Sequence, residues 1–181
     1  MALTSTIYNF AIELSDVDRG VYETLELRVA MHPSESAEYL VTRVLGYCLE
    51  YTEGIEFTAG LSNGDEPAIV VRDLTGKITA WIEVGMPDAD RLHRASKLAD
   101  RVAVYTHREL RNVLGQLQER KIHRGEEIPI YSFGRGFIES VAEKLQRRVR
   151  MTLSVTERHL YLDFDDASFT TVIEESRLPP S

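Results

Sequence analysis

A single carboxylate, Glu83, interrupts an otherwise apolar run over residues 78–84, ITAWIEV. The run is too short and too rich in β-branched and aromatic residues for a helix, so it predicts a buried strand. An ionised side chain inside such a strand is costly unless a cation or hydrogen bonds compensate it. Glu83 is therefore the first candidate for a functional residue. Two structural alternatives stay open: a half-exposed position in the strand, or an ion pair with one of the arginines that follow.

A turn and a basic helix follow this strand. Gly85, Pro87 and Asp88 in the turn GMPDAD predict a reversal of the chain and a helix N-terminus. The cations of the predicted helix recur at three- and four-residue spacing: Arg91, Arg94, Lys97 and Arg101. The strand acid, the turn and the basic helix together form the predicted functional region.

The net charge of −8 disfavours indiscriminate binding to nucleic acid, but the charge is unevenly distributed. Residues 1–90 carry 5 Lys+Arg and 16 Asp+Glu, whereas residues 91–124 carry 9 and 3. Cations beside carboxylates suit an enzyme that acts on phosphodiesters, because cations hold the backbone while carboxylates hold metal. Solvated faces of two surface helices would give the same pattern.

Length and composition indicate a soluble globular protein. The chain has 181 residues, enough for one domain with a substantial core, and it lacks an apolar run of membrane-spanning length. The N-terminus does not resemble a secretory signal, so we expect a cytoplasmic protein. The single cysteine, Cys48, lies in an apolar helical stretch and is expected to be buried and inert.

The hydrophobic pattern predicts a mixed α/β (α+β) protein with a central sheet flanked by helices. A strand hairpin is expected over residues 4–30, and a long amphipathic helix follows, with Ser34 as its N-cap. Residues 68–71 and 78–84 are expected to form a second hairpin around the turn 73–77. The segment 91–121 reads as helix, strand and helix. A strand at IPIYSF, a helix at GRGFIESVAEKLQ and two or three antiparallel strands complete the prediction.

Signatures of several enzyme classes are missing. The chain has no P-loop, HExxH, GxSxG or paired-cysteine motif, and its five histidines lack the spacing of zinc ligands. The glycines of GRGFIE predict a tight turn into a helix. A set of carboxylates remains, of a kind that suits a hard divalent cation: Glu35 or Glu38 in the first helix, Asp65 or Glu66 before one strand, and Glu83 in the next.

Five segments resemble the YaeQ family of small bacterial proteins: HPSES, DEPA, WIEVGMPD, RLHRAS and VAVYTH, in this order and spacing. The resemblance covers essentially the whole chain. It implies one domain over residues 1–181, with a core similar to the PD-(D/E)XK nuclease (restriction endonuclease-like) superfamily at roughly 34–133 and extra antiparallel strands at 1–30 and 149–176.

That superfamily pairs an Asp after a proline with an acid two residues before a Lys. The resemblance places the second acid at Glu83, but Ala68 follows Pro67 and Gly85 occupies the place of the lysine. Asp65 or Glu66 would then have to reach the metal from a shifted position. Arg94 or Lys97 would supply the cation, with Arg91 next. The predicted metal ligands are Glu83, Asp65 or Glu66, and Glu35 or Glu38. The predicted catalytic residues are Glu83, Arg94 and Lys97, and the predicted substrate-binding residues are Arg91, Arg94 and Lys97. Magnesium or manganese is the expected cofactor.

The leading hypothesis is a magnesium-dependent nuclease or phosphodiesterase that acts on DNA or RNA, in which Lys97 or Arg94 offsets developing charge. The alternative is a catalytically inactive module that binds nucleic acid or protein, acting in transcription or repair. Ala68 and Gly85 distinguish the two hypotheses. If no acid can occupy the missing metal-ligand position, the binding module is favoured.

Overall fold

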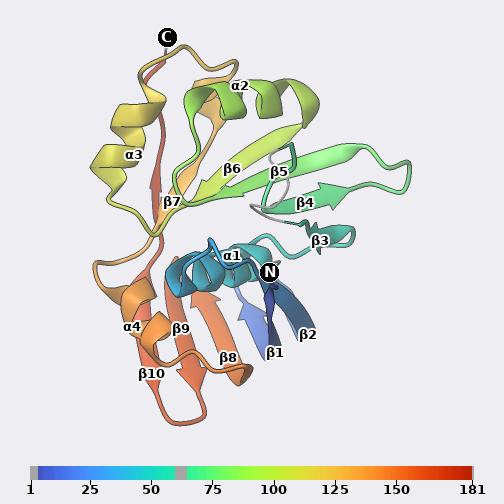
Figure 1. Ribbon diagram of the computed structural model, residues 1–181, viewed down its shortest axis with the longest axis vertical. Coiled ribbons are helices and arrows are strands. Elements are labelled where there is room, and N and C mark those ends of the chain that lie inside the picture. Colours follow the sequence, from blue (N-terminus) through green and yellow to red (C-terminus); the bar gives the residue numbers. More distant parts are fainter. Residues whose placement is uncertain (1–3, 60–64, 181) are drawn as a thin grey trace. The chain divides into compact units, whose positions relative to one another are not determined.

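The computed structural model describes residues 4–59 and 65–180, which form the mixed α/β fold that the sequence predicts (Figure 1). In chain order the elements are β1 Thr6–Asp16, β2 Val21–Met31, α1 Ala37–Leu49, β3 Ile55–Phe57, β4 Ile69–Arg72, β5 Ile78–Val84, α2 Ala89–Leu98, β6 Arg101–Tyr105, α3 Leu110–Leu117, the 3₁₀ helix η2 Gly125–Glu127, β7 Ile130–Ser132, α4 Phe137–Glu143, β8 Arg148–Thr156, β9 His159–Phe164, β10 Ser168–Val172 and β11 Glu174–Ser176.

The described residues divide into two compact units. One comprises residues 4–41 and 133–174, and the other comprises residues 42–132 and 175–180, so the division falls within α1. Each unit has a sheet: β10-β9-β8-β1-β2 in the first and β11-β7-β6-β5-β4-β3 in the second. The strands predicted at the two ends of the chain therefore form a sheet of their own, and the expectation of one central sheet was too simple. A single domain over the whole chain stays a prediction.

Three antiparallel pairs and one parallel pair build the five-stranded sheet. β1 and β2 pair antiparallel from Thr6↔Met31 to Asp16↔Val21, which confirms the predicted N-terminal hairpin. β8 pairs parallel with β1, and β9 and β10 follow antiparallel. Side chains alternate between a buried and a more exposed face, because successive residues of a strand point to opposite sides.

The six-stranded sheet holds the predicted second hairpin. β4 pairs antiparallel with β5 through Ile69↔Ile82 and Val70↔Trp81. Asp73 closes the turn between them by accepting hydrogen bonds from the backbone of Thr75 and Lys77. β5 then pairs parallel with β6, and β6 with β7. Residue 83 thus lies at the end of β5 that adjoins the start of β4.

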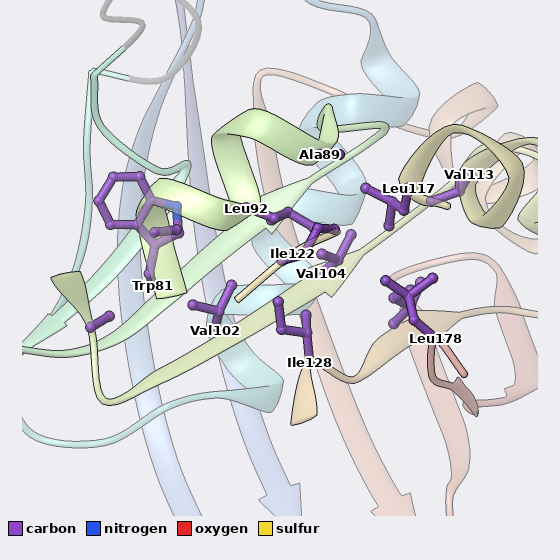
Figure 2. Close-up of a cluster of buried hydrophobic side chains, with 13 residues drawn as sticks. Trp81, Ala89, Leu92, Val102, Val104, Val113, Leu117, Ile122, Ile128 and Leu178 are labelled. Atoms are coloured by element: carbon purple, nitrogen blue, oxygen red, sulfur yellow. The ribbon is translucent and has the colours of Figure 1, made fainter. Parts of the chain in front are cut away.

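Helices α2 and α3 contribute buried apolar residues to a cluster on this sheet (Figure 2). Leu92 and Leu117, on α2 and α3, are fully buried, and Val104 meets them from β6. Trp81 belongs to the same cluster, so the face of β5 that carries Trp81 also carries Glu83. α2 begins as predicted, because the Asp88 side chain accepts the Arg91 N–H at 2.7 Å.

Two local predictions were wrong, and a third agrees with the structure. Ser36, not Ser34, accepts the N–H of Tyr39 at 3.1 Å and starts α1. α2 ends at Leu98, so Arg101 is the first residue of β6 rather than part of the basic helix. Gly136 has φ 80° at the start of α4, which agrees with the predicted tight turn.

Cys48 is fully buried, as predicted, and forms no disulfide within the described residues. Within residues 4–59 and 65–180, no helix is long and apolar enough to cross a membrane.

Candidate functional site

Glu83 is buried in β5, as the sequence predicts, with an exposed fraction of 5%. Its Oε1 atom accepts two hydrogen bonds, one from the indole Nε1 of Trp81 at 2.6 Å and one from Nε of Arg91 at 2.8 Å. Trp81 precedes Glu83 by two residues, so both side chains lie on one face of the strand. The half-exposed alternative is excluded, and the ion-pair alternative describes the structure.

The partner of Glu83 is Arg91 rather than Arg94. Arg91 lies in the first turn of α2, and its side chain is 21% exposed. Its Nη2 also donates a hydrogen bond to the main-chain carbonyl of Glu66. One guanidinium therefore links the end of β5 to the segment that leads into β4, where a bound cation would otherwise be expected.

Burial dominates the ionisation of Glu83. Removal from water raises the pKa of its carboxyl group, while the charge of Arg91 and the hydrogen bonds from Trp81 and Arg91 oppose this shift. The charge of Asp88 adds slightly to the increase. A buried carboxyl with a raised pKa and a specific cationic partner is a feature that concentrates at functional sites, although structural ion pairs produce it as well.

A second arginine, which no sequence motif indicates, holds the segment around Ala68. Arg43 on α1 is 1% exposed and donates from Nε and Nη2 to the carbonyl of Ala68, at 3.2 and 3.1 Å. It also donates to the carbonyl of Thr58 at 2.5 Å, and its guanidinium lies 5.1 Å from the ring centre of Phe57. The only sequence signal was a lone arginine in the apolar run VTRVL.

The structure accounts for the residues at the two positions that depart from the nuclease pattern, Ala68 and Gly85. Ala68 is 3% exposed, and its carbonyl is engaged by Arg43. Gly85 has φ 92°, and its N–H donates to the carbonyl of Tyr105 at 2.9 Å. A lysine at position 85 would have to adopt the left-handed region, which is unfavourable for residues with a β-carbon.

The other predicted carboxylates belong to two different units. Asp65 is exposed, and Glu66 contributes its main-chain carbonyl to Arg91. Glu35 and Glu38 belong to the first unit, where Oε1 of buried Glu35 accepts the N–H of His32 at 3.2 Å and Glu38 lies in the first turn of α1.

Among the residues that the structure describes, no group of three or more His, Cys, Asp or Glu could hold a metal ion. Oε1 of Glu83 is moreover already occupied by two donors. The carboxylates of the described residues, as arranged here, do not form a site that fits magnesium or manganese. The metal cofactor therefore stays a prediction.

Arg94 and Lys97 are exposed on α2, three residues apart. Neither makes an ion pair or a side-chain hydrogen bond within the described part of the chain. Residues three apart lie on one face of a helix, so the two cations form a small basic surface. Arg91 starts the same row but is turned toward Glu83.

Arg101 belongs to a different cluster. It donates to both carboxylate oxygens of Glu50, at 2.6 and 3.1 Å, and Glu50 also accepts the hydroxyl of Tyr105 at 2.8 Å. Burial of Arg101 favours its neutral form, but the hydrogen bond and charge of Glu50 outweigh burial and raise its pKa. Burial and the same carboxylate raise the pKa of Tyr105. No sequence motif indicates this cluster, because its members lie far apart in the chain.

The chain is similar to proteins of one family along nearly its whole length. The family model of the YaeQ protein matches residues 1–173. A relative from Salmonella typhi, named "Uncharacterized protein YaeQ", is 28% identical over 163 residues, which are 90% of each chain. The protein of that name from Escherichia coli strain K12 is 37% identical over 107 residues, 59% of each chain.

Two solved structures share the fold. The crystal structure of YaeQ protein from Pseudomonas syringae superposes with a TM-score of 0.87 at 30% identity, over 98% of this chain and 97% of that chain. The crystal structure of YaeQ protein from Xanthomonas axonopodis pv. citri superposes with a TM-score of 0.83 at 27% identity, over 97% and 100%. The predicted family is therefore confirmed, and the chain belongs to the YaeQ family.

Proposed function

We propose that this protein is a catalytically inactive nucleic-acid-binding module built on a nuclease-like core, in which α2 contacts the phosphate backbone. One observation carries the proposal: the exposed pair Arg94 and Lys97 lacks an acidic partner among the described residues, whereas the neighbouring Arg91 is held by Glu83. Exposed, unpaired cations in a row are free to neutralise phosphates, and the counterions released on binding favour association.

The candidate site supports a role in binding over a role in cleavage. Ala68 directly precedes β4 and Glu83 lies in β5, and these two strands are antiparallel neighbours. Ala68, however, carries no carboxylate where the nuclease pattern has an aspartate. The left-handed backbone of Gly85 disfavours the lysine that the nuclease pattern has at this position. Arg91 supplies a permanent positive charge to Glu83, because an arginine in a protein does not lose its proton.

A magnesium-dependent nuclease or phosphodiesterase is the second candidate. It is favoured by the burial of Glu83 and by its raised pKa, which are typical of groups with a functional role. This candidate requires that magnesium or manganese binds with Glu83 and that cleavage depends on it.

The test compares binding and cleavage on the same preparations. Fluorescence anisotropy with single-stranded and duplex DNA and with RNA should show binding at low salt that Arg94→Ala/Lys97→Ala weakens at least tenfold. The control Arg148→Ala/Arg150→Ala removes two exposed cations from β8 in the first unit and should bind like the wild type. Absence of binding at low salt would overturn the proposal and leave a protein-interaction module.

Plasmid and oligonucleotide cleavage with magnesium or manganese separates the two candidates. The binding module predicts no cleavage and no calorimetric signal for either metal. Metal-dependent cleavage that Glu83→Gln abolishes, and that the exposed control Glu119→Gln retains, would establish the enzyme instead.

A further inference from the structure

Three arginines from separate segments surround one small cavity in the second unit. The cavity has a volume of about 200 Å³ and lies between the end of α2, the start of β6, the chain from η2 to β7, and the residues that follow β11. Arg101, Arg124 and Arg177 line it, together with Tyr131. The nucleic-acid surface proposed above consists of other residues, so the two proposals can be tested independently.

Each guanidinium is held in place by the protein. Arg101 is bound by Glu50 and lies 3.5 Å from the hydroxyl of Tyr131. Arg124 donates from Nε to Glu127 at 2.7 Å and from Nη2 to the carbonyl of Asp100 at 3.0 Å. Arg177 donates to Glu175 and, from Nη1, to the carbonyl of Glu127 at 3.1 Å.

These bonds leave donors free for a ligand. A guanidinium has five N–H groups, and Nε of Arg101 and Nη1 of Arg124 have no acceptor within the described residues. The carboxylate partners balance the charge of the arginines, so directed N–H donors, rather than net charge, would provide the specificity. An arginine already fixed by a carboxylate also loses less side-chain entropy when it binds a second anion.

The backbone of Arg124 gives an independent indication. Its φ of 53° and ψ of 33° lie in the left-handed region, where glycine is the favoured residue. Residues held in this region concentrate at functional sites, because the surrounding structure must offset their strain. Here the strained position places a guanidinium at the cavity, a contribution that a glycine could not make.

The size and lining restrict the ligand. The volume is below the roughly 300–1,000 Å³ of clefts that bind drug-sized molecules, so the occupant is small. Arginine forks match the paired oxygens of carboxylates and phosphates. Val102, Ile128 and Pro129 provide apolar wall for the remainder of such a molecule. We propose that this cavity binds a small oxyanion, in the form of a compact carboxylate or phosphate compound.

The decisive variant is Arg124→Gly, which removes the guanidinium while its backbone accepts the left-handed conformation without strain. Its thermal unfolding temperature without ligand should therefore stay close to that of the wild type, because relief of backbone strain offsets the lost hydrogen bonds to Glu127 and Asp100. Its affinity for the anion should fall at least tenfold. Arg158→Gly is the matched control: Arg158 also has a positive φ, 64°, but it lies in the first unit and does not line the cavity.

The measurement is isothermal calorimetry of the full chain with inorganic phosphate and with malonate, at constant ionic strength. Saturable binding of one of them by the wild type and by Arg158→Gly, lost in Arg124→Gly and in Arg177→Gln, supports the site. Which of the two probes binds identifies phosphate or carboxylate as the ligand class. The proposal is overturned if neither probe saturates, or if Arg124→Gly binds like the wild type. Loss of oligonucleotide binding in Arg94→Ala/Lys97→Ala has no bearing on this result.

Discussion

Arg43 and Arg91 hold the chain on either side of Pro67. Arg43 donates to the carbonyl of Ala68, and Arg91 donates to that of Glu66. Both guanidinium groups come from helices, Arg43 from α1 and Arg91 from α2. These two side chains position the segment next to Glu83, and we expect its position to be insensitive to chelators.

The pH dependence of stability tests whether burial or Arg91 dominates the ionisation of Glu83. Because burial raises the pKa of Glu83, the folded protein keeps its proton at pH values where the unfolded chain has lost it. The free energy of unfolding therefore falls, relative to Glu83→Gln, as the pH rises from below the ordinary value of 4.5 through the higher pKa of the folded state. The Tm of Glu83→Gln minus the Tm of the wild type should accordingly increase with pH. A difference that decreases would show that Arg91 dominates.

Removing the cation should be more costly than removing the acid. Arg91→Met leaves Glu83 buried without its charged partner, and we expect a loss of about 2 kcal/mol in the free energy of unfolding at neutral pH. This is less than the roughly 3–5 kcal/mol of a fully buried pair, because the arginine is partly exposed. Chemical denaturation measures it. Arg94→Met, on the same helix but exposed and without an acidic partner in the described chain, should change stability by no more than about 0.5 kcal/mol.

At the scale of elements, the start of α1 offers a direct comparison of two serines. Ser36→Ala removes the side-chain acceptor of the Tyr39 N–H and should cost about 1 kcal/mol of stability. Ser34→Ala removes only an exposed contact with His32 and should leave the free energy of unfolding nearly unchanged. Urea unfolding of both variants provides the measurement. Equal losses would mean that Ser36 does not cap the helix.

Local signals predicted the elements better than the contacts between them. The β4–β5 hairpin followed from two apolar runs around a turn, and Asp88 marked the start of α2. The end of α2 was missed because the cationic spacing continues to Arg101 without a glycine or proline stop. The chain leaves the helix there since the β-branched residues after Arg101 complete a buried strand next to β5.

The candidate site was predictable only in part, for a geometric reason. Glu83 was identifiable because an acid in an apolar strand is rare. Its partner was not, since sequence spacing does not reveal which turn of α2 faces the strand. Arg91, in the first turn after a short connection, reaches back to β5, whereas Arg94 lies one turn farther along and is exposed. The engagement of Ala68 by Arg43 depends on packing between elements 25 residues apart.

At the scale of the whole molecule, the net charge of −8 shapes any interaction with a polyanion. Repulsion from the acidic majority weakens nonspecific attraction, so binding must depend on local cations and must weaken as the salt concentration rises. The positively charged segment 91–124 is the part of the chain where such cations are concentrated.

The salt dependence of DNA binding counts those cations. The logarithm of the association constant should fall linearly with the logarithm of salt concentration, with a slope of about −0.9 for each phosphate neutralised on a duplex. If Arg94 and Lys97 each contact one phosphate, their joint replacement by alanine should reduce the magnitude of this slope by about 2, and it should weaken different sequences equally. Arg148→Ala/Arg150→Ala changes the net charge by the same amount from β8 in the first unit, so its slope should match that of the wild type. Equal reductions in both double variants would mean that overall charge, rather than the exposed row on α2, governs binding.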